Sequence, residues 1–358
     1  MRILFVCGRE PEYTRNQIVL KALRRHAEVL EITDSSKNYI ITHLKLLFKI
    51  VTNTRPYDVI FVGFYGYLLV FLMRLVSRKP IIFDAYLSTY NTLCFDRKRF
   101  RPDSLLGRIV YWMDRLACRF ADVVLLDTRA HLDYFVRIYA LPPERCAVLY
   151  VGSDEEIFHP RKPPRDGPFT VFYYGSFLPL QGIEYIVRAA RIIQDRQPGI
   201  IFQIAGNGIQ YQEIRTLAQQ LKCKTIEFIP WIPYEQLPNY IARAWLCLGG
   251  HFADSDKAQN VISTKTYQFL AMARPTIVGD CRANAEIFHH GEHVYMVKMA
   301  DAQALAEAIL LLYLNDELRQ RIADGGFIRF SEHYSVERLS TVLCEIVGQV
   351  YAALPHHS

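Results

Sequence analysis

Three signatures that would narrow the class of this protein at once are missing from its sequence. The eight cysteines include no C-x-x-C pair and several lie in apolar runs, so they predict neither a zinc site nor a disulfide framework. The uncharged apolar stretch Val59 to Met73 has fifteen residues, fewer than the roughly 20 of a membrane-spanning helix. No repeat interleaves aromatic and basic residues, which argues against a nucleic-acid binder.

An export signal is also missing. The apolar residues Met1 to Cys7 are too few for the core of a signal peptide, and Glu10 and Glu12 stand where small residues would mark a cleavage site. Free cysteines suit a reducing compartment. We therefore expect a cytoplasmic protein, either free or associated with the inner face of the membrane.

The length and the charge distribution indicate two domains with different partners. A chain of 358 residues exceeds what one hydrophobic core usually spans. Residues 1–165 carry 26 basic and 17 acidic side chains, whereas the remainder carries 16 and 19. A basic first half favours an anionic partner, such as anionic lipid, nucleic acid or a phosphorylated ligand.

Short apolar runs alternate with helix-like segments along the whole chain, which is typical of an α/β fold with a parallel sheet covered on both faces. The series starts a second time after residue 168, so we expect two Rossmann-like domains. The expected strands are 3–7, 58–64, 80–86, 122–127 and 146–151, then 169–174, 200–205, 225–230, 245–249, 275–279 and 294–297.

A Pro-rich polar stretch separates the two series and predicts the domain bounds. We expect an N-terminal domain over 1–160, a linker over 161–168, a C-terminal domain over 169–334, and a final helical segment over 335–358 that packs on either domain. Ligands of open parallel sheets bind beyond the carboxyl ends of the strands, so the loops after the strands should line a cleft between the domains.

The second half contains two glycine-containing strand-to-helix turns. Gly175 begins the first, and its amides and the following helix start would favour a phosphate; an ordinary turn is an equally good interpretation. Gly206 and Gly208 repeat the arrangement after the next strand. Trp231, in a Pro-flanked turn, either packs or presents backbone groups to a nucleobase.

A lysine at an expected helix start is the most informative feature of the second half. Ser263 and Thr264 look like N-cap residues, and Lys265 follows them. A lysine there opposes the helix dipole, so it is usually solvated; that opposition is also a reason to expect an anion.

The ordered motifs resemble a known family. They are G-S-F-x-P-L-Q-G from Gly175, A-G-N-G from Ala205, F-I-P-W-I-P-Y-E-Q-L-P from Phe228, and K-T-Y-Q-F-L-A-M-A-R-P-T-I-V from Lys265. In this order they resemble the second half of a family 4 glycosyltransferase of the GT-B fold, a retaining family that uses nucleotide sugars. The segment V-G-S-D-E-E-I-F-H-P that ends at Pro160 is similar to the family's approach to its linker.

The resemblance implies a nucleoside diphosphate sugar held by the C-terminal domain, an acceptor held by the N-terminal domain, and no cofactor or metal ion. Leaving-group charge would be stabilised by amides and basic side chains. The implied donor contacts are Gly175, Ser176, Phe177, Gln181, Gly206, Gly208, Trp231, Ile232, Lys257, Asn260, Thr264 and Gln268.

The sequence departs from the family pattern at the positions that usually carry charge. Ser176 and Gln181 replace an Arg and a Lys, and the usual pair of glutamates falls on Asn260 and Gln268. The diphosphate then needs another cation. Lys265 is our main candidate and is assigned a catalytic role, with Lys257 as the nearest alternative.

Acceptor contacts are expected after the strands of the first half. Asp84 is a candidate to orient or deprotonate an acceptor hydroxyl, and capping of its loop is an equally good interpretation. Tyr86 and Ser88 follow it, and Gly8 and Arg15 follow the first strand, where they would face the acceptor or the donor phosphates.

Residues 39–51 have apolar side chains at helical spacing, with Lys45 and Lys49 among them. Such a basic amphipathic face suits contact with anionic membrane, although core packing explains the apolar residues equally well.

The sequence thus predicts a retaining, metal-independent glycosyltransferase that moves a hexose-type sugar to a glycan or lipid-linked acceptor. The pathway would be polysaccharide, glycolipid or lipid-linked glycan synthesis. Two alternatives remain open: a degenerate subunit that binds nucleotide sugar without turnover, and a GT-B nucleotide-sugar epimerase. The epimerase is disfavoured because no paired acid and base is evident.

Overall fold

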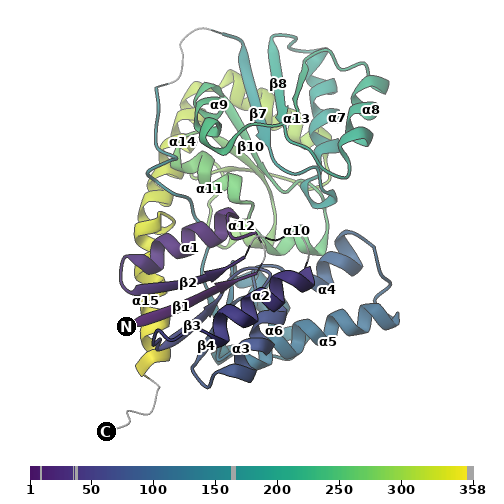
Figure 1. The fold of residues 1–358 in the computed structure, drawn as a ribbon. Coiled ribbons are helices and arrows are strands. Elements are labelled where there is room, and N and C mark those ends of the chain that lie inside the picture. The colour runs from purple at the N-terminus through teal and green to yellow at the C-terminus, as the bar shows by residue number, and fades with distance from the viewer. Residues whose placement is uncertain (9, 35, 37–38, 163–166, 353–358) are drawn as a thin grey trace. The chain divides into compact units, whose positions relative to one another are not determined.

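The computed structural model describes residues 1–8, 10–34, 36, 39–162 and 167–352. The chain forms two compact units (Figure 1). The first unit comprises Met1–Val151 and Val336–Ser358, and the second unit comprises Gly152–Ser335. Each unit contains a six-stranded parallel sheet with helices on both faces, so the predicted α/β class with two Rossmann-like domains is confirmed.

The sheet of the first unit has the strand order β2-β1-β3-β4-β5-β6. The chain leaves β1 toward β2 and returns past β1 to β3, so β1 and β3 are neighbours at the point where the direction reverses. The strands are β1 (Arg2–Cys7), β2 (Glu28–Thr33), β3 (Val59–Val62), β4 (Ile81–Asp84), β5 (Val123–Leu126) and β6 (Cys146–Val148).

Helices cover both faces of this sheet because its central strands are apolar throughout. One face packs against α2, α3, α5 and α6, and the other packs against α1 and the last helix, α15. The helices are α1 (Thr14–Arg24), α2 (Tyr39–Val51), α3 (Tyr67–Val76), α4 (Thr89–Asn91), α5 (Leu105–Phe120), α6 (Arg129–Tyr139) and α15 (Val336–Ala352), with one π turn, η1 (Thr92–Asp96), and one 3₁₀ turn, η2 (Pro143–Arg145).

The sheet of the second unit has the order β12-β11-β10-β7-β8-β9, so its direction reverses between β7 and β10. Its strands are β7 (Phe169–Tyr174), β8 (Ile200–Ala205), β9 (Ile226–Ile229), β10 (Leu246–Gly250), β11 (Thr276–Gly279) and β12 (Tyr295–Val297). Its helices are α7 (Ile183–Gln194), α8 (Tyr211–Gln220), α9 (Leu237–Arg243), α10 (Asp256–Asn260), α11 (Thr264–Ala271), α12 (Arg282–Ala285), α13 (Ala302–Leu314) and α14 (Asp316–His333), with the 3₁₀ turns η3 (Pro179–Gln181) and η4 (Tyr234–Gln236).

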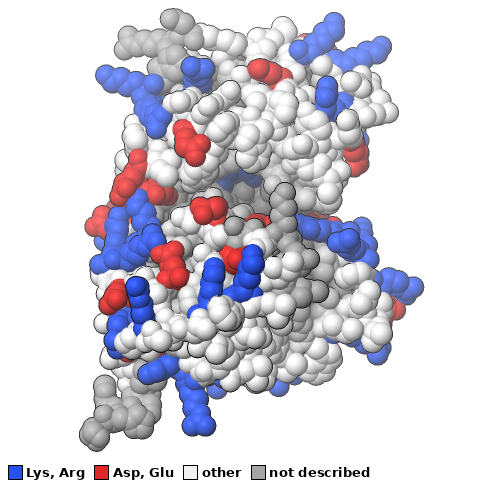
Figure 2. Space-filling view, in the orientation of Figure 1, with Lys and Arg blue, Asp and Glu red and all other residues white. Residues whose placement is uncertain are grey.

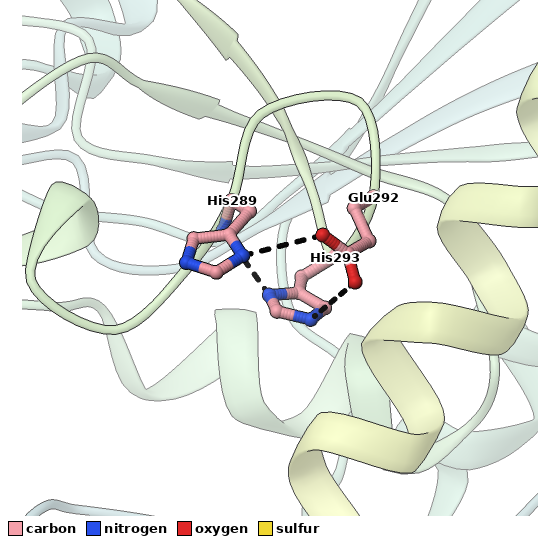
Figure 3. Close-up of side chains that lie close together, drawn as sticks. All are labelled: His289, Glu292 and His293. Atoms are coloured by element: carbon pink, nitrogen blue, oxygen red, sulfur yellow. Dashed lines mark hydrogen bonds and ion pairs between the residues drawn. The ribbon is translucent and has the colours of Figure 1, made fainter.

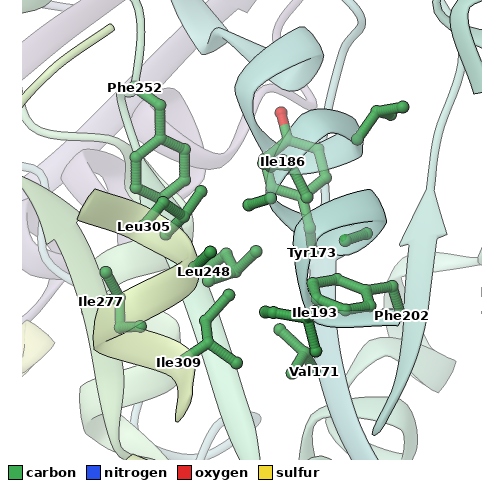
Figure 4. Close-up of a cluster of buried hydrophobic side chains, with 14 of the residues drawn as sticks. Val171, Tyr173, Ile186, Ile193, Phe202, Leu248, Phe252, Ile277, Leu305 and Ile309 are labelled. Atoms are coloured by element: carbon green, nitrogen blue, oxygen red, sulfur yellow. The ribbon is translucent and has the colours of Figure 1, made fainter. Parts of the chain in front are cut away.

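The largest core of the second unit lies between its sheet and the helices α7 and α13 (Figure 4). Ile186 and Ile193 of α7 face Val171 and Phe202 of the sheet, and Ile309 of α13 lies beside them. All five side chains are at most 1% exposed. This packing fixes β7, β8 and β10, and with them the loops that follow those strands.

The units divide at Val151 and Val336, whereas the sequence placed the division at 161–168. Residues after Val151 already pack on the second unit: Ser153 bridges to Ser335, and the Phe158 ring meets Tyr234 with a centroid separation of 5.5 Å. Part of the predicted linker, residues 163–166, lies outside the described residues. The final helix belongs to the first unit, where α15 packs on α1.

Among the described residues, none of the helices combines the length and the hydropathy that crossing a bilayer requires.

Candidate functional site

At the point of strand reversal in the second unit, the loop after β7 meets the connection from β10 to α11. Ligands of open parallel sheets bind where neighbouring strands send their connections in opposite directions, which here is beyond the ends of β7 and β10. The loop after β7 contains Gly175 and Gln181, β10 ends at Gly250, and Lys265 lies in the first turn of α11. We call the group formed by Gly175, Gln181, Gly250 and Lys265 the lysine site.

The ammonium group of Lys265 is enclosed by neutral groups. Its Nζ donates to Gln181 Oε1 and to Ser263 Oγ, both at 2.8 Å. It also lies 4.9 Å from the centre of the Tyr173 ring, whose hydroxyl donates to the same Gln181 oxygen at 3.0 Å. Among the described residues no carboxylate pairs with it, although the side chain is 4% exposed. A buried cation without a counter-ion is costly, so an anionic ligand would be stabilised here.

Burial lowers the pKa of Lys265 to about 7, far below the usual range of lysine. The ammonium is therefore only partly populated near neutral pH in the free protein. An anion that approached Nζ would favour the charged form and raise the pKa again. Ser263, predicted as an N-cap, makes no side-chain cap to the helix, because its hydroxyl accepts from Lys265 instead.

Glycines allow the loops after β7 and β8 to approach each other and Lys265 closely. Gly175 has φ of +150°, and a Cβ there would lie 3.1 Å from Lys265 Cε. Gly206, with φ of +130°, packs so closely that a Cβ would lie 2.0 Å from the Gly175 carbonyl oxygen. A Cβ at Gly208 would lie 2.7 Å from the Phe177 amide nitrogen. The glycines of both predicted turns therefore bring the loop after β8 against the loop after β7.

The other predicted donor contacts take different positions. Ser176 is exposed, whereas Phe177 is part of the core. Trp231 is 74% exposed and Ile232 is buried, so this turn presents the tryptophan ring to solvent. Thr264 begins α11 beside the lysine site.

The two amides that replace the usual glutamates differ in their partners. Asn260 is buried in α10, where its Nδ2 donates to the Asp256 carbonyl oxygen at 2.8 Å. Gln268 is buried in α11, and its Oε1 has no hydrogen-bond partner among the described residues. Lys257, the alternative cation, lies in α10 and is half-buried.

His251 is a residue of this region that the sequence analysis did not select. It follows β10 directly, is 4% exposed, and its Nδ1 has no partner among the described residues. Burial, together with the charges of Lys265 and Lys257, lowers its pKa to about 3, so the imidazole is neutral. The only sequence signal was a histidine directly after the Gly-Gly end of an apolar run.

The structure corrects the roles predicted for Arg15 and Asp84. Arg15 is fully buried and donates to both Asp84 oxygens, at 2.9 and 3.1 Å, and to the carbonyl oxygens of Leu149 and Tyr150. A guanidinium bound in this way is not available to a donor phosphate. The Asp84 carboxylate is likewise engaged by two charge-assisted hydrogen bonds, so we assign the pair a structural role.

Ser88 and Tyr86 are likewise engaged within the first unit. The Ser88 hydroxyl donates to Asp114 at 3.0 Å and caps α4 by accepting from the Asn91 amide. Tyr86 is 8% exposed and packs edge-on against Phe64, at 5.2 Å between ring centres. Gly8 lies against the side chain of Leu46 in α2, because a Cβ there would be 2.9 Å from Leu46 Cδ1.

Asp114 and an Asp–His pair are further polar groups of the first unit that sequence reasoning missed. Burial raises the pKa of the Asp114 carboxyl to about 7, although Tyr90, Ser88 and Tyr139 donate to it. At the end of β5, His131 Nδ1 lies 2.6 Å from Asp127 Oδ1, and both residues are buried. Their spacing of four residues at a helix start was a usable signal.

A third cluster, on the loop before β12, has the composition of a metal site. The ligand atoms of His289, Glu292 and His293 lie within 4.8 Å of one another (Figure 3). However, His293 Nδ1 accepts the backbone N–H of His289 at 3.1 Å, which places the proton of the neutral ring on Nε2, facing Glu292 at 3.5 Å. Both ring nitrogens are then engaged, so we assign the cluster to closing its loop.

Comparisons with known proteins agree with the fold. Residues 154–328 match the family described as Glycosyl transferases group 1. The alpha-D-kanosaminyltransferase of Streptomyces kanamyceticus is 24% identical over 301 residues, which cover 80% of this chain and 74% of that protein.

Two solved structures resemble the whole chain. HepE of Anabaena, in complex with UDP, has a TM-score of 0.75 at 15% identity and covers 98% of this chain and 100% of its own. The sucrose-phosphate synthase of Thermosynechococcus elongatus has a TM-score of 0.77 at 15% identity and covers 99% and 100%. The chain has the GT-B fold of these proteins, and the matches together support a glycosyltransferase.

Proposed function

We propose that this protein is a retaining, metal-independent glycosyltransferase of family 4. It would move a hexose-type sugar from a nucleoside diphosphate sugar to a hydroxyl of a glycan or lipid-linked acceptor. The observation that carries the proposal is the buried Lys265, which has only neutral partners at the point of strand reversal. The complexes of HepE with UDP and with UDP-glucose support a uridine nucleotide as the first donor to test.

The lysine site supplies the charge that the departure of a nucleoside diphosphate demands. In the proposed reaction the anionic donor favours the protonated form of Lys265. The ammonium then stabilises the diphosphate oxygens as the bond to the sugar breaks. Gln181 holds the lysine in place, because its Oε1 accepts from both Nζ and the Tyr173 hydroxyl. The ammonium takes the part that a divalent cation has in other transferases, so we propose that no metal is required.

The neighbouring buried polar atoms suit the hydroxyls of a sugar or a ribose. His251 Nδ1 and Gln268 Oε1 are both buried acceptors without a partner among the described residues. A neutral imidazole and a neutral amide accept from hydroxyl groups without adding charge. We propose these two residues as contacts of the donor's hydroxyls.

We place the acceptor on the first unit, at the carboxyl ends of its strands. Tyr13, Phe64 and Tyr86 form an aromatic cluster there, with ring centres 4.8 to 6.2 Å apart. Sugar rings present apolar faces that pack on such side chains. The buried pair of Asp127 and His131 is a more plausible proton acceptor at this edge than Asp84, which is bound by Arg15.

The proposal is tested by nucleotide-dependent stabilisation of the full chain. Thermal melts with UDP, GDP, ADP and their sugars should show one base that raises the midpoint, because a ligand of the native state stabilises it by mass action. The matched variants are Lys265→Met, which should lose the shift, and Lys257→Met, which should keep it. A shift that both variants retain would place the nucleotide elsewhere.

A further inference from the structure

The outward face of α5 is apolar and remains exposed along most of its length. Five side chains along it are 38% to 75% exposed, at intervals of three or four residues that align them on one side of the helix. We call them the α5 stripe: Leu105, Ile109, Trp112, Leu116 and Phe120.

The opposite face of α5 packs against the core of the first unit. Gly107, Asp114, Ala117 and Cys118 are buried, and the last two belong to the core beneath the helix. Of the α5 stripe, Phe120 packs edge-on against Phe71 of α3, at 5.5 Å between ring centres, while all five side chains stay exposed. A helix that is apolar on both sides is covered on both sides when the protein works, and exposed apolar patches of this kind mark interaction surfaces.

The charged side chains of α5 that flank the α5 stripe are all positive. Arg108, Arg115 and Arg119 lie along one edge of it, and Arg115 is placed over the Trp112 ring at 4.9 Å. The only acidic residue of the helix, Asp114, points into the core. Among the described residues, none of these three arginines forms an ion pair. In Figure 2, the part of the first unit that carries α5 is mostly white, with Lys and Arg and some acidic surface at its margins.

A second helix of the same layer repeats the pattern. Helices α2 and α5 cover the same face of the sheet, so their outward faces belong to one side of the unit. Leu44, Phe48 and Val51 of α2 are 63%, 71% and 64% exposed. Lys45 and Lys49 lie next to them: Lys45 donates to the Ser36 hydroxyl, and Lys49 donates to the Thr33 carbonyl oxygen and pairs with Asp34.

We propose that the α5 stripe, together with these three residues of α2, docks the protein on a bilayer that contains anionic lipid. The apolar side chains would enter the interface between headgroups and acyl chains, while the flanking arginines contact lipid phosphates. A second copy of the chain fits less well, because two identical faces would bring arginines against arginines. The proposal stands apart from the transfer reaction, since it concerns neither the donor nor the lysine site.

The first test is co-sedimentation of the full chain with vesicles. Binding is expected to vesicles of phosphatidylcholine with one third phosphatidylglycerol, to be absent with phosphatidylcholine alone, and to weaken as salt is raised. Trp112 should move from water into the interface, so its fluorescence should shift to the blue on binding. The Trp112→Phe variant should bind and lack this shift.

Matched variants on the second unit show whether a loss of vesicle binding is specific to the α5 stripe. Ile109→Ser with Leu116→Ser should weaken vesicle binding about tenfold or more, whereas Leu314→Ser with Ile328→Ser, which are more exposed and lie on the second unit, should not. Arg108→Glu with Arg119→Glu should weaken it about 30-fold, from roughly fivefold per basic residue, and Arg196→Glu with Arg215→Glu should have little effect.

Three results would overturn the proposal. They are equal binding to neutral and anionic vesicles or to neither, retention of binding by the α5 variants, and a dimer in light scattering that the α5 variants dissociate. In each case nucleotide-dependent stabilisation, measured on the same preparations, would still report on the proposed function by itself.

Discussion

Binding of a nucleoside diphosphate should draw a proton into the lysine site. The pKa of Lys265 is about 7 in the free protein because the side chain is buried among neutral groups. A diphosphate next to Nζ favours the ammonium form and should return the pKa toward the usual range of lysine. Above pH 7 the bound complex therefore holds a proton that the free protein lacks.

The size of this effect follows from the pKa. At pH 8 a group with a pKa of about 7 is about 90% neutral, so binding should take up about 0.9 proton, whereas at pH 6.5 the uptake should be about 0.2. The affinity should accordingly fall as pH rises above 7. The same shift affects folding: the unfolded chain binds the proton up to about pH 10.5, so the free energy of unfolding gains from Lys265 between pH 7 and that value.

Isothermal titration calorimetry in buffers of different ionisation enthalpy measures the uptake directly. Lys265→Arg, which is charged at every accessible pH, should bind without proton uptake at pH 8. Proton uptake by this variant equal to that of the wild type would refute the reasoning. So would its absence from the wild type at pH 8 despite binding.

Three further predictions follow from contacts in the two units. Gly206→Ala should lower the free energy of unfolding by about 1–3 kcal/mol and abolish nucleotide binding, because its Cβ would meet the Gly175 carbonyl oxygen, whereas Gly199→Ala, with open space around it, should be silent in thermal melts and titrations. Asp114→Asn should remove a pH dependence in urea unfolding: the raised pKa means that the folded state holds the proton longer, so the wild type should lose about 2–3 kcal/mol relative to the variant between pH 5 and pH 8. Arg15→Met should lower the free energy of unfolding by about 3–5 kcal/mol, because it leaves its carboxylate partner buried and unpaired; a loss below 1 kcal/mol would contradict the structural role.

The sequence predicted the sheet well because the strands of buried parallel sheets are continuous apolar runs. β2 was not predicted. It is an edge strand in which Glu28 and Glu31 are exposed and Ile32 alone is buried, so it lacks the apolar run on which the prediction depended. Helix-like segments between the strands were predicted, but not which apolar face of α5 would remain exposed, since that depends on the neighbouring helices.

The site was predicted by position and not by environment. The sequence indicated Lys265 as a cation near a helix start, but its burial depends on Gln181 and Tyr173, which come from a distant part of the chain. The ion pair of Arg15 and Asp84 joins residues 69 apart, so local patterns predicted two free side chains where the fold makes one bound pair. Non-local contacts of this kind decide the charge state and the availability of a side chain.

The release of nucleoside diphosphate from nucleotide sugars tests the central claim most directly. The full chain is incubated with each donor and a panel of glycan and lipid-linked acceptors, and the released diphosphate and the fate of the sugar are followed by NMR. Transfer with retention is expected, slowed about 30-fold to 800-fold by Lys265→Ala and little changed by Lys257→Ala. An isomerised donor, binding without release, or turnover of Lys265→Ala within about threefold of the wild type would contradict the account.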